Sequence, residues 1–192
     1  MIEYLSRYFA ITIFYYNPNI HPQHEYERRL AELQKFLVAF PLAVQNRVQL
    51  IVADYNPEDY FVATNVREEP ALQTEPERGE RCRRCYQFRM KRAYEYACAH
   101  GFDWFTTTLS ISPHKDADKI NVIGEQLAAP LIALPPADSA KPRFLLSNFK
   151  KRGGYLRSTQ LSAEYGLWRQ DYCGCVYSYS QKERLQQSAC NA

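Results

Sequence analysis

The chain alternates short apolar runs with longer stretches in which apolar residues recur every three or four positions. Runs of the first kind predict β-strands, and stretches of the second kind predict amphipathic helices. Strands are expected at residues 10–16, 48–53, 104–109 and 143–149, and the main helices at residues 25–40, 81–100, 113–127 and 158–165. Strands that alternate with helices are typical of a doubly wound, mostly parallel sheet. We therefore expect one α/β domain over residues 1–192, with a polar helix or tail at residues 181–192.

Polar segments follow three of the predicted strands. They are Asn17–Pro22, Asp54–Pro57 and Thr106–Ser112. Ligands of doubly wound sheets bind beyond the carboxyl ends of the strands, so these segments are expected to converge on one cleft. Ser112 is the expected N-cap of a helix that starts at Pro113. Residues 129–142 are rich in Ala and Pro and predict a surface loop.

Hydrophobic residues make up 46% of the 192 residues, which is enough for a core and argues against disorder. The formal net charge of +3 is too small to indicate nucleic-acid binding by itself. Basic residues gather at 78–92 and 141–157, where they either bind phosphates or form solvated faces. The sequence has no apolar run near the ~20 residues that cross a bilayer, and its start lacks the pattern of a signal peptide. We expect a cytoplasmic protein and a monomer.

Four of the six cysteines form two closely spaced pairs, Cys82-x-x-Cys85 and Cys173-Gly-Cys175. Structural disulfides are rare in the cytoplasm, so these cysteines indicate metal or redox chemistry first. At the start of a helix, the first pair would present both sulfurs on one face, where unpaired N–H groups favour anions. Four thiolates suit zinc or an iron–sulfur cluster, and spacing alone does not choose between them. The alternative is a set of buried structural cysteines, which the arginines around the first pair disfavour.

The segment Thr106–Ser112 is rich in hydroxyl groups and leads from a predicted strand into a predicted helix. Such a strand exit can hold a phosphate or another anion, and Lys115 just beyond it would add a positive charge. Hydroxyl groups also cap helices without any ligand, so both interpretations stay open.

Six segments together resemble a known family, the QueH-type epoxyqueuosine reductases. The matching segments are Asn17–Pro22, Glu25-Tyr26 with Arg29, Glu77–Gly79 with Arg81–Cys85, Thr106–Ser112, Asn148–Lys151 and Arg169–Cys175. The resemblance runs in order from about residue 10 to residue 180 and includes several long, unusual pieces.

The resemblance implies a Rossmann-like fold of the nucleotide α-hydrolase type. It also implies an oxidoreductase of queuosine biosynthesis that reduces the epoxide of epoxyqueuosine in the tRNA anticodon loop to queuosine. The implied cofactors are a 4Fe–4S cluster and an adjacent iron, and an unidentified partner donates the electrons. The cysteines that match metal ligands of the family are Cys82, Cys85, Cys173 and Cys175. The residues expected to bind the nucleoside and the tRNA are Asn17, Asn19, His21, Tyr26, Arg29, Arg81, Thr107, Thr108, Ser110, Ser112, Lys115, Lys150, Arg169 and Gln170.

One part of the family pattern is missing from the sequence. Members of the family begin with a strand and a Cys-Cys-x-Pro-Cys loop, and we expect that strand and its cysteines to be absent here. The four remaining thiolates suffice for one cluster, but not for a cluster and a separate iron ligated as in the family. Zinc is the alternative metal.

Two other functions fit the same residues. The first is a tRNA sulfur transferase on a similar fold, whose ATP-binding loop would follow the absent strand. The second is a zinc-stabilised RNA-binding module without catalytic activity. Visible absorbance and acid-labile sulfide in protein purified without oxygen would exclude the zinc module, whereas colourless protein with one zinc would support it.

Overall fold

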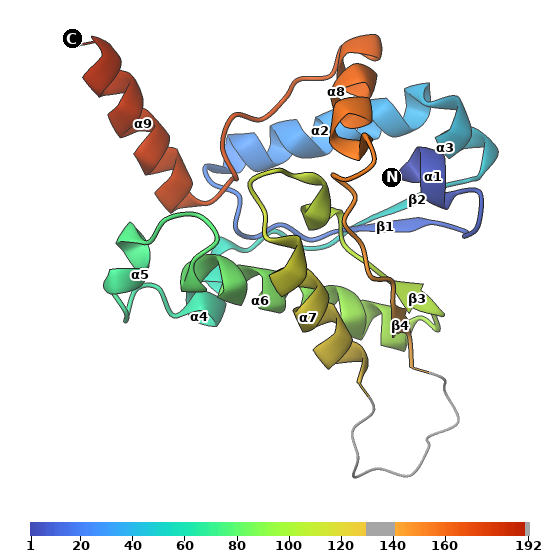
Figure 1. Ribbon diagram of the computed structural model, residues 1–192, viewed down its shortest axis with the longest axis horizontal. Helices are drawn as coiled ribbons and strands as arrows, with labels where there is room; N and C mark the ends of the chain where they lie inside the picture. Colours follow the sequence, from blue (N-terminus) through green and yellow to red (C-terminus); the bar gives the residue numbers. More distant parts are fainter. Residues whose placement is uncertain (130–140, 191–192) are drawn as a thin grey trace. The chain divides into compact units, whose positions relative to one another are not determined.

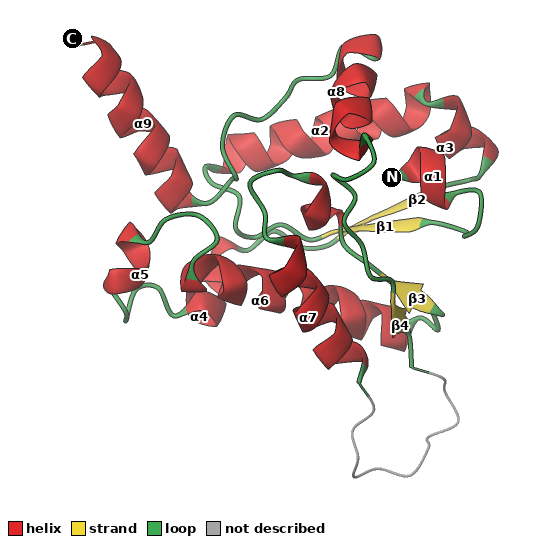
Figure 2. Ribbon diagram, in the orientation of Figure 1, coloured by secondary structure: helices red, strands yellow, loops and turns green. Residues whose placement is uncertain are grey.

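The computed structural model describes residues 1–129 and 141–190. Its backbone divides into two compact units. The first unit joins Met1–Thr74 to Leu156–Ala192, and the second consists of Glu75–Tyr155. Figure 1 shows the order of the elements, and Figure 2 shows that the longest helices are much longer than the strands. Within the described ranges, no helix is long and apolar enough to cross a membrane.

The first unit is built on two parallel strands against which a long helix packs. Strand β1 (Thr12–Tyr15) pairs with β2 (Gln49–Val52) in parallel. Helix α2 (Gln23–Ala39) runs between them in the chain and lies alongside them in Figure 1. Their shared core consists of Tyr15, Ile20 and Tyr26, against which pack Leu30, Leu33, Leu50 and Tyr55. The other helices are α1 (Ile2–Leu5), α3 (Pro41–Gln45), α4 (Pro57–Thr64), α5 (Ala71–Thr74), α8 (Gly154–Glu164) and α9 (Val176–Cys190).

The second unit packs two helices against a shorter parallel pair of strands. Its elements are α6 (Glu80–Ala99), β3 (Trp104–Phe105), the 3-10 helix η1 (Thr108–Ile111), α7 (Ala117–Ala128) and β4 (Arg143–Phe144). Met90 on α6, Ile120 and Ile123 on α7, and Phe105 and Phe144 on the strands share one core. Gly124 permits this packing, because a Cβ atom there would lie 2.4 Å from the Phe144 ring.

The expected fold class is confirmed as a mixed α/β protein with parallel strands. The sequence predicts one continuous sheet, whereas in the described residues the hydrogen bonds join the four strands into two separate pairs. The pair β3–β4 is also shorter than predicted. After Phe105 the chain leaves the extended conformation, the Thr106 hydroxyl donates to the Leu145 carbonyl, and the 3-10 helix begins at Thr108.

The starts of three helices differ markedly from the prediction, and helix α8 begins at Gly154 rather than at residue 158. Helix α7 begins at Ala117 rather than Pro113, because the Asp116 side chain accepts hydrogen bonds from the N–H groups of Asp118 and Lys119 and caps it. The last helix, α9, begins at Val176, whereas the polar helix or tail is predicted only from residue 181. The predicted surface loop at residues 129–142 lies mostly outside the described residues.

Candidate functional site

The Cys173-Gly174-Cys175 turn stands immediately before helix α9 in the first unit. Its two sulfur atoms lie 3.5 Å apart. Gly174 has a φ of +114°, a backbone conformation that glycine adopts without the strain of a side chain. A Cβ atom at this position would also lie 2.9 Å from the Arg29 guanidinium. The glycine therefore lets the two cysteines turn toward each other while the arginine approaches closely.

Ser178 contacts both sulfurs of the turn. Its hydroxyl oxygen lies 2.9 Å from the Cys173 sulfur and 3.5 Å from the Cys175 sulfur, and it donates to the Cys175 carbonyl at 2.9 Å. The sequence did not single out this residue, because the C-terminal helix was expected to begin only at residue 181. A prediction that the helix begins directly after Cys175 would have placed Ser178 beside that cysteine, since residues three apart on a helix are neighbours.

The Asn17–Pro22 segment holds the turn by two reciprocal hydrogen bonds. The His21 N–H donates to the Gly174 carbonyl at 2.7 Å, and the Tyr172 hydroxyl donates to the His21 carbonyl at 2.6 Å. The peptide bond between His21 and Pro22 is cis. Asn19 is buried beside the turn, and its side-chain oxygen has no hydrogen-bond partner among the described residues. Asn17 begins the segment, and its carbonyl accepts from the Ile20 N–H at 3.1 Å.

The segments at the carboxyl ends of β1 and β2 also meet, as the sequence predicts. The Tyr55 hydroxyl donates to the Ile20 carbonyl at 2.7 Å, and the Tyr55 ring stacks on that of Tyr26 with centroids 4.1 Å apart. Burial, followed by the negative charge of Asp54, raises the pKa of Tyr26 above its ordinary value. Tyr26, an expected substrate-binding residue, thus lies in the core beneath the site.

The two other expected binding residues of this unit precede the cysteine turn. Arg169 is exposed and donates to the Ser158 carbonyl and the Ser162 hydroxyl on helix α8. Gln170 is exposed. Next to them, burial and then the Glu25 carboxylate raise the pKa of Tyr172, which keeps its hydroxyl protonated as a donor.

The second unit presents Cys82 and Cys85 in the first turns of helix α6, where the sequence predicts them. Both side chains are buried, and their spacing of three residues places them on one face of the helix. Arg81 beside them is also buried, and its backbone N–H donates to a carboxylate oxygen of Glu75 at 2.8 Å.

Glu80 carries a lowered pKa at the start of the same helix. The Arg83 guanidinium forms two hydrogen bonds to its carboxylate, at 2.6 and 2.7 Å, and Arg84 adds a third at 3.1 Å. These hydrogen bonds, with that of Arg83 contributing most, lower the pKa of Glu80 to about 2. The negative charge is therefore present at the helix N-terminus at any physiological pH.

We expect Glu80→Gln to lower the free energy of unfolding at pH 7 by roughly 0.2–1 kcal/mol, because 36% of the Glu80 side chain is exposed and solvent screens the pair. The folded pKa lies below the unfolded one, so this contribution is fully present above pH 4.5 and declines as the pH falls toward 2. Urea unfolding of both proteins between pH 7 and pH 3 checks this. If the difference in unfolding free energy between the two proteins stayed constant down to pH 3, the lowered pKa of Glu80 would be contradicted.

The hydroxyl-rich segment after β3 forms a polar cluster with the segment after β4. The Ser110 hydroxyl is buried 2.9 Å from that of Ser147, and the Ser147 N–H donates to the Asn121 side chain at 3.0 Å. The Lys150 ammonium donates to the Lys115 carbonyl at 2.8 Å. The expected binding residues Ser110, Lys115 and Lys150 are thus brought together at the carboxyl ends of a parallel pair of strands.

The remaining hydroxyl groups of this segment have local roles in the structure. The Thr107 side chain accepts from the Leu109 N–H and caps the 3-10 helix, in which Thr108 is exposed. The Ser112 hydroxyl accepts from the His114 N–H at 3.2 Å and does not cap α7.

Within each cysteine pair, the spacing is compatible with two thiolates that bind one metal. Metal–sulfur bonds of ~2.3 Å in a tetrahedral site hold two sulfurs ~3.8 Å apart, close to the 3.5 Å between Cys173 and Cys175. Cys82 and Cys85 share a helix face, where such neighbours have Cβ atoms ~5–6 Å apart. Among the residues that the structure describes, no group of three or more His, Cys, Asp or Glu side chains is gathered around one point.

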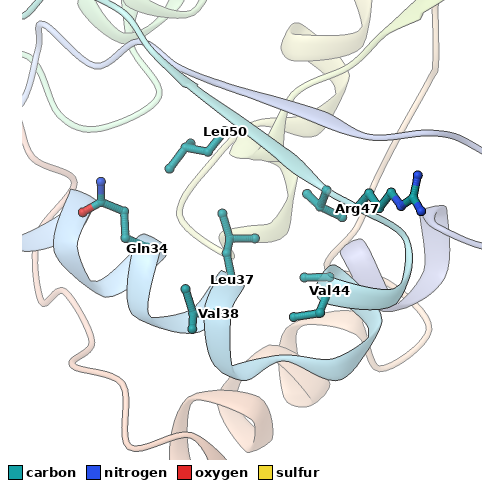
Figure 3. Close-up of a pocket in the computed structure, with 8 residues that line it drawn as sticks. Gln34, Leu37, Val38, Val44, Arg47 and Leu50 are labelled. Atoms are coloured by element: carbon teal, nitrogen blue, oxygen red, sulfur yellow. The ribbon is translucent and has the colours of Figure 1, made fainter.

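A shallow apolar groove of about 540 Å³ lies on the first unit between α2, α3 and β2. Figure 3 shows Leu37 and Val38 of α2 on one side, and Val44 of α3 and Leu50 of β2 around the rest. Arg47 is the charged residue among those that line the groove. None of the residues expected to bind metal, nucleoside or tRNA lines this groove.

Comparison with known proteins points to one family. A family model described as epoxyqueuosine reductase QueH matches residues 1–181. The chain is 41% identical over 177 residues to the epoxyqueuosine reductase QueH of Streptococcus pyogenes serotype M1, an alignment that covers 92% of this chain and 64% of that protein. It is 34% identical over 177 residues to the protein of the same name from Staphylococcus epidermidis, with 92% and 69% covered. A third relative, from Thermotoga maritima, is 34% identical over 170 residues, with 88% and 79% covered.

The chain therefore spans just under two thirds of the length of the first of these relatives. Both the family match and the relatives favour a reductase over a sulfur transferase.

Proposed function

The chain belongs to the QueH family of epoxyqueuosine reductases, and from this membership we propose that it acts in reducing epoxyqueuosine in tRNA to queuosine. The observation that supports the proposal most is the family match over residues 1–181, which includes both cysteine pairs. The geometry of the first unit supports it as well, because the Cys173–Cys175 turn has the sulfur separation that a thiolate-bound metal needs.

Reduction of the epoxide to an alkene consumes two electrons and two protons and releases the oxygen as water. A metal-bound site that does this needs an electron source, an acid at the oxygen and a pocket from which bulk water is excluded. An iron–sulfur cluster, when bound, supplies the electrons. We propose Cys82, Cys85, Cys173 and Cys175 as metal ligands, with a 4Fe–4S cluster as the expected group and zinc as the alternative. These four thiolates leave no ligand for the adjacent iron of the family.

The protein's own side chains would bind and orient the modified nucleotide. In the first unit, His21 donates a hydrogen bond to the cysteine turn, and Arg169 and Gln170 lie just before the turn in the sequence. All three are exposed and accessible to a polar ligand. In the second unit, the Phe149 N–H donates to the buried Ser110 hydroxyl, and the next residue, Lys150, carries a positive charge that suits phosphate oxygens. Lys115, whose ammonium lies over the Tyr86 ring, is a second cation in this part of the unit. We propose that these residues bind the nucleoside and the tRNA backbone.

Several finer expectations belong to the same proposal. The parallel direction of both strand pairs supports a doubly wound sheet of the nucleotide α-hydrolase type. We further propose that the protein acts in the cytoplasm as a monomer, on tRNA carrying epoxyqueuosine, with electrons from a separate donor.

The experiment is complementation of a bacterium whose own epoxyqueuosine reductase genes are deleted. We expect the chain, joined to the N-terminal strand and Cys-Cys-x-Pro-Cys loop of the family, to convert epoxyqueuosine in total tRNA to queuosine, measured by nucleoside mass spectrometry. A Cys173→Ser variant serves as the inactive control, and the relative from Streptococcus pyogenes serves as the positive control. The proposal is overturned if the chain accumulates as folded, iron-containing protein but the tRNA keeps its epoxyqueuosine while the relative converts it.

A further inference from the structure

The side chain of Arg29, on helix α2, donates hydrogen bonds to backbone carbonyls at the cysteine turn. One terminal nitrogen donates to the Cys173 carbonyl at 3.3 Å, and the other donates to the Tyr172 carbonyl at 3.2 Å. The third nitrogen, Nε, donates to the Glu25 carboxylate at 2.7 Å. The guanidinium thus has a protein acceptor at each of its three nitrogens.

Burial makes these contacts persistent. Only 10% of the Arg29 side chain and 7% of the Glu25 side chain are exposed. Removing a buried charge from its partner is costly, so the pair holds the guanidinium at one place on α2. The ring of Tyr172 lies beneath the guanidinium, 5.0 Å from it, and restricts it from a second side.

The two carbonyls belong to consecutive residues at the entrance of the Cys173-Gly174-Cys175 turn. A planar guanidinium spans two adjacent acceptors at a fixed separation, whereas a lysine ammonium acts as a point charge. The contact therefore fixes the peptide planes on both sides of Cys173 and, with them, the direction of the Cys173 side chain. The His21 N–H donates to the carbonyl that follows, that of Gly174.

We propose that Arg29 is a positioning residue that presets the separation of the Cys173 and Cys175 sulfurs, with Glu25 as its buried counterion. Its sequence position alone suggested a role in binding tRNA. The importance of this role for catalysis rests on the proposed function, but the preset geometry itself does not require a bound cluster. Arg29 thereby preorganises the turn as a chelating site for any centre that binds two thiols.

The probe is phenylarsine oxide, which condenses with two nearby thiols to form two As–S bonds and releases the oxygen with both thiol protons as water. The full chain is reduced, freed of metal, titrated with the arsenical and then alkylated with iodoacetamide. Peptide mass spectrometry reports protection of the Cys173–Cys175 peptide and, in the same sample, of the Cys82–Cys85 peptide. The second peptide is the internal control.

We expect Arg29→Lys and Arg29→Met to raise the arsenical concentration for half-protection of the Cys173–Cys175 peptide by about tenfold or more, as loss of a ligand-orienting contact does. The Cys82–Cys85 peptide should titrate as in the unmodified protein. Arg28→Met removes the neighbouring arginine of α2, which lies over Trp168, and should shift neither peptide.

The proposal is overturned if Arg29→Lys titrates like the unmodified protein, or if both peptides shift together with a lower melting temperature. Either result would make Arg29 a purely structural residue. Iron and acid-labile sulfide, measured separately on each protein, test the proposed function. A chain that binds no iron but shows the selective shift would refute that function and leave the positioning role in place.

Discussion

Serine in place of Cys173 or Cys175 is expected to reduce the bound iron and acid-labile sulfide at least about tenfold, the scale of losses at metal sites. A serine hydroxyl does not ionise at neutral pH as a metal-bound thiol does, so the variant lacks a ligand while its shape is kept. The same result is expected for Cys82→Ser and Cys85→Ser. Protein purified without oxygen is assayed for iron, sulfide and visible absorbance.

Cys98→Ser is the matched control for these variants. Cys98 lies on the same helix as Cys82 and Cys85, but its side chain is exposed. It should keep the full iron and sulfide content. Retention of both by all four paired-cysteine variants would contradict the assignment of the ligands, and colourless protein with one zinc would support a structural zinc site instead.

The largest expected effect on stability is that of Ile120→Ala in the second unit. Ile120 has no exposed surface and packs in one core with Phe105 and Phe144. Truncation leaves a cavity that close-packed neighbours fill only in part, which costs about 2–5 kcal/mol. Urea unfolding followed by far-UV circular dichroism measures the change, with the m-value checked for a constant unfolded surface.

Val122→Ala provides the comparison on the same helix. Its side chain is 51% exposed, so the change should stay within roughly 0.5 kcal/mol. Similar losses for Ile120→Ala and Val122→Ala would contradict the position of the core. Since Asn121 binds the Ser147 N–H, a severe loss at Ile120 is also expected to disorder the hydroxyl cluster.

Local sequence patterns predicted most helices and strands of this protein. The helix predicted at residues 25–40 spans Gln23–Ala39, and the one predicted at residues 81–100 spans Glu80–Ala99. The apolar periodicity of these helices and the signals for their ends depend on residues that are close in sequence. A single sequence is therefore enough to predict them. The predicted start of α7 was wrong because Asp116 caps the helix, and a distant contact adds to this effect: the Arg78 guanidinium donates to the carbonyls of Pro113 and His114. The segment before Asp116 is thereby kept out of the helix.

The family was recognisable from the order of residues alone, because motifs of cysteines, prolines and hydroxyl residues are preserved as spacing along a chain. The same motifs led to the proposed ligands. Only the tertiary structure decided what individual polar residues touch. Arg29 and Cys173 are 144 positions apart, so their hydrogen bond leaves no trace in local spacing. Tyr26 likewise became a core residue through stacking on Tyr55. The physical reason is that a side chain's function depends on its partners and its burial, and both arise when distant segments pack together.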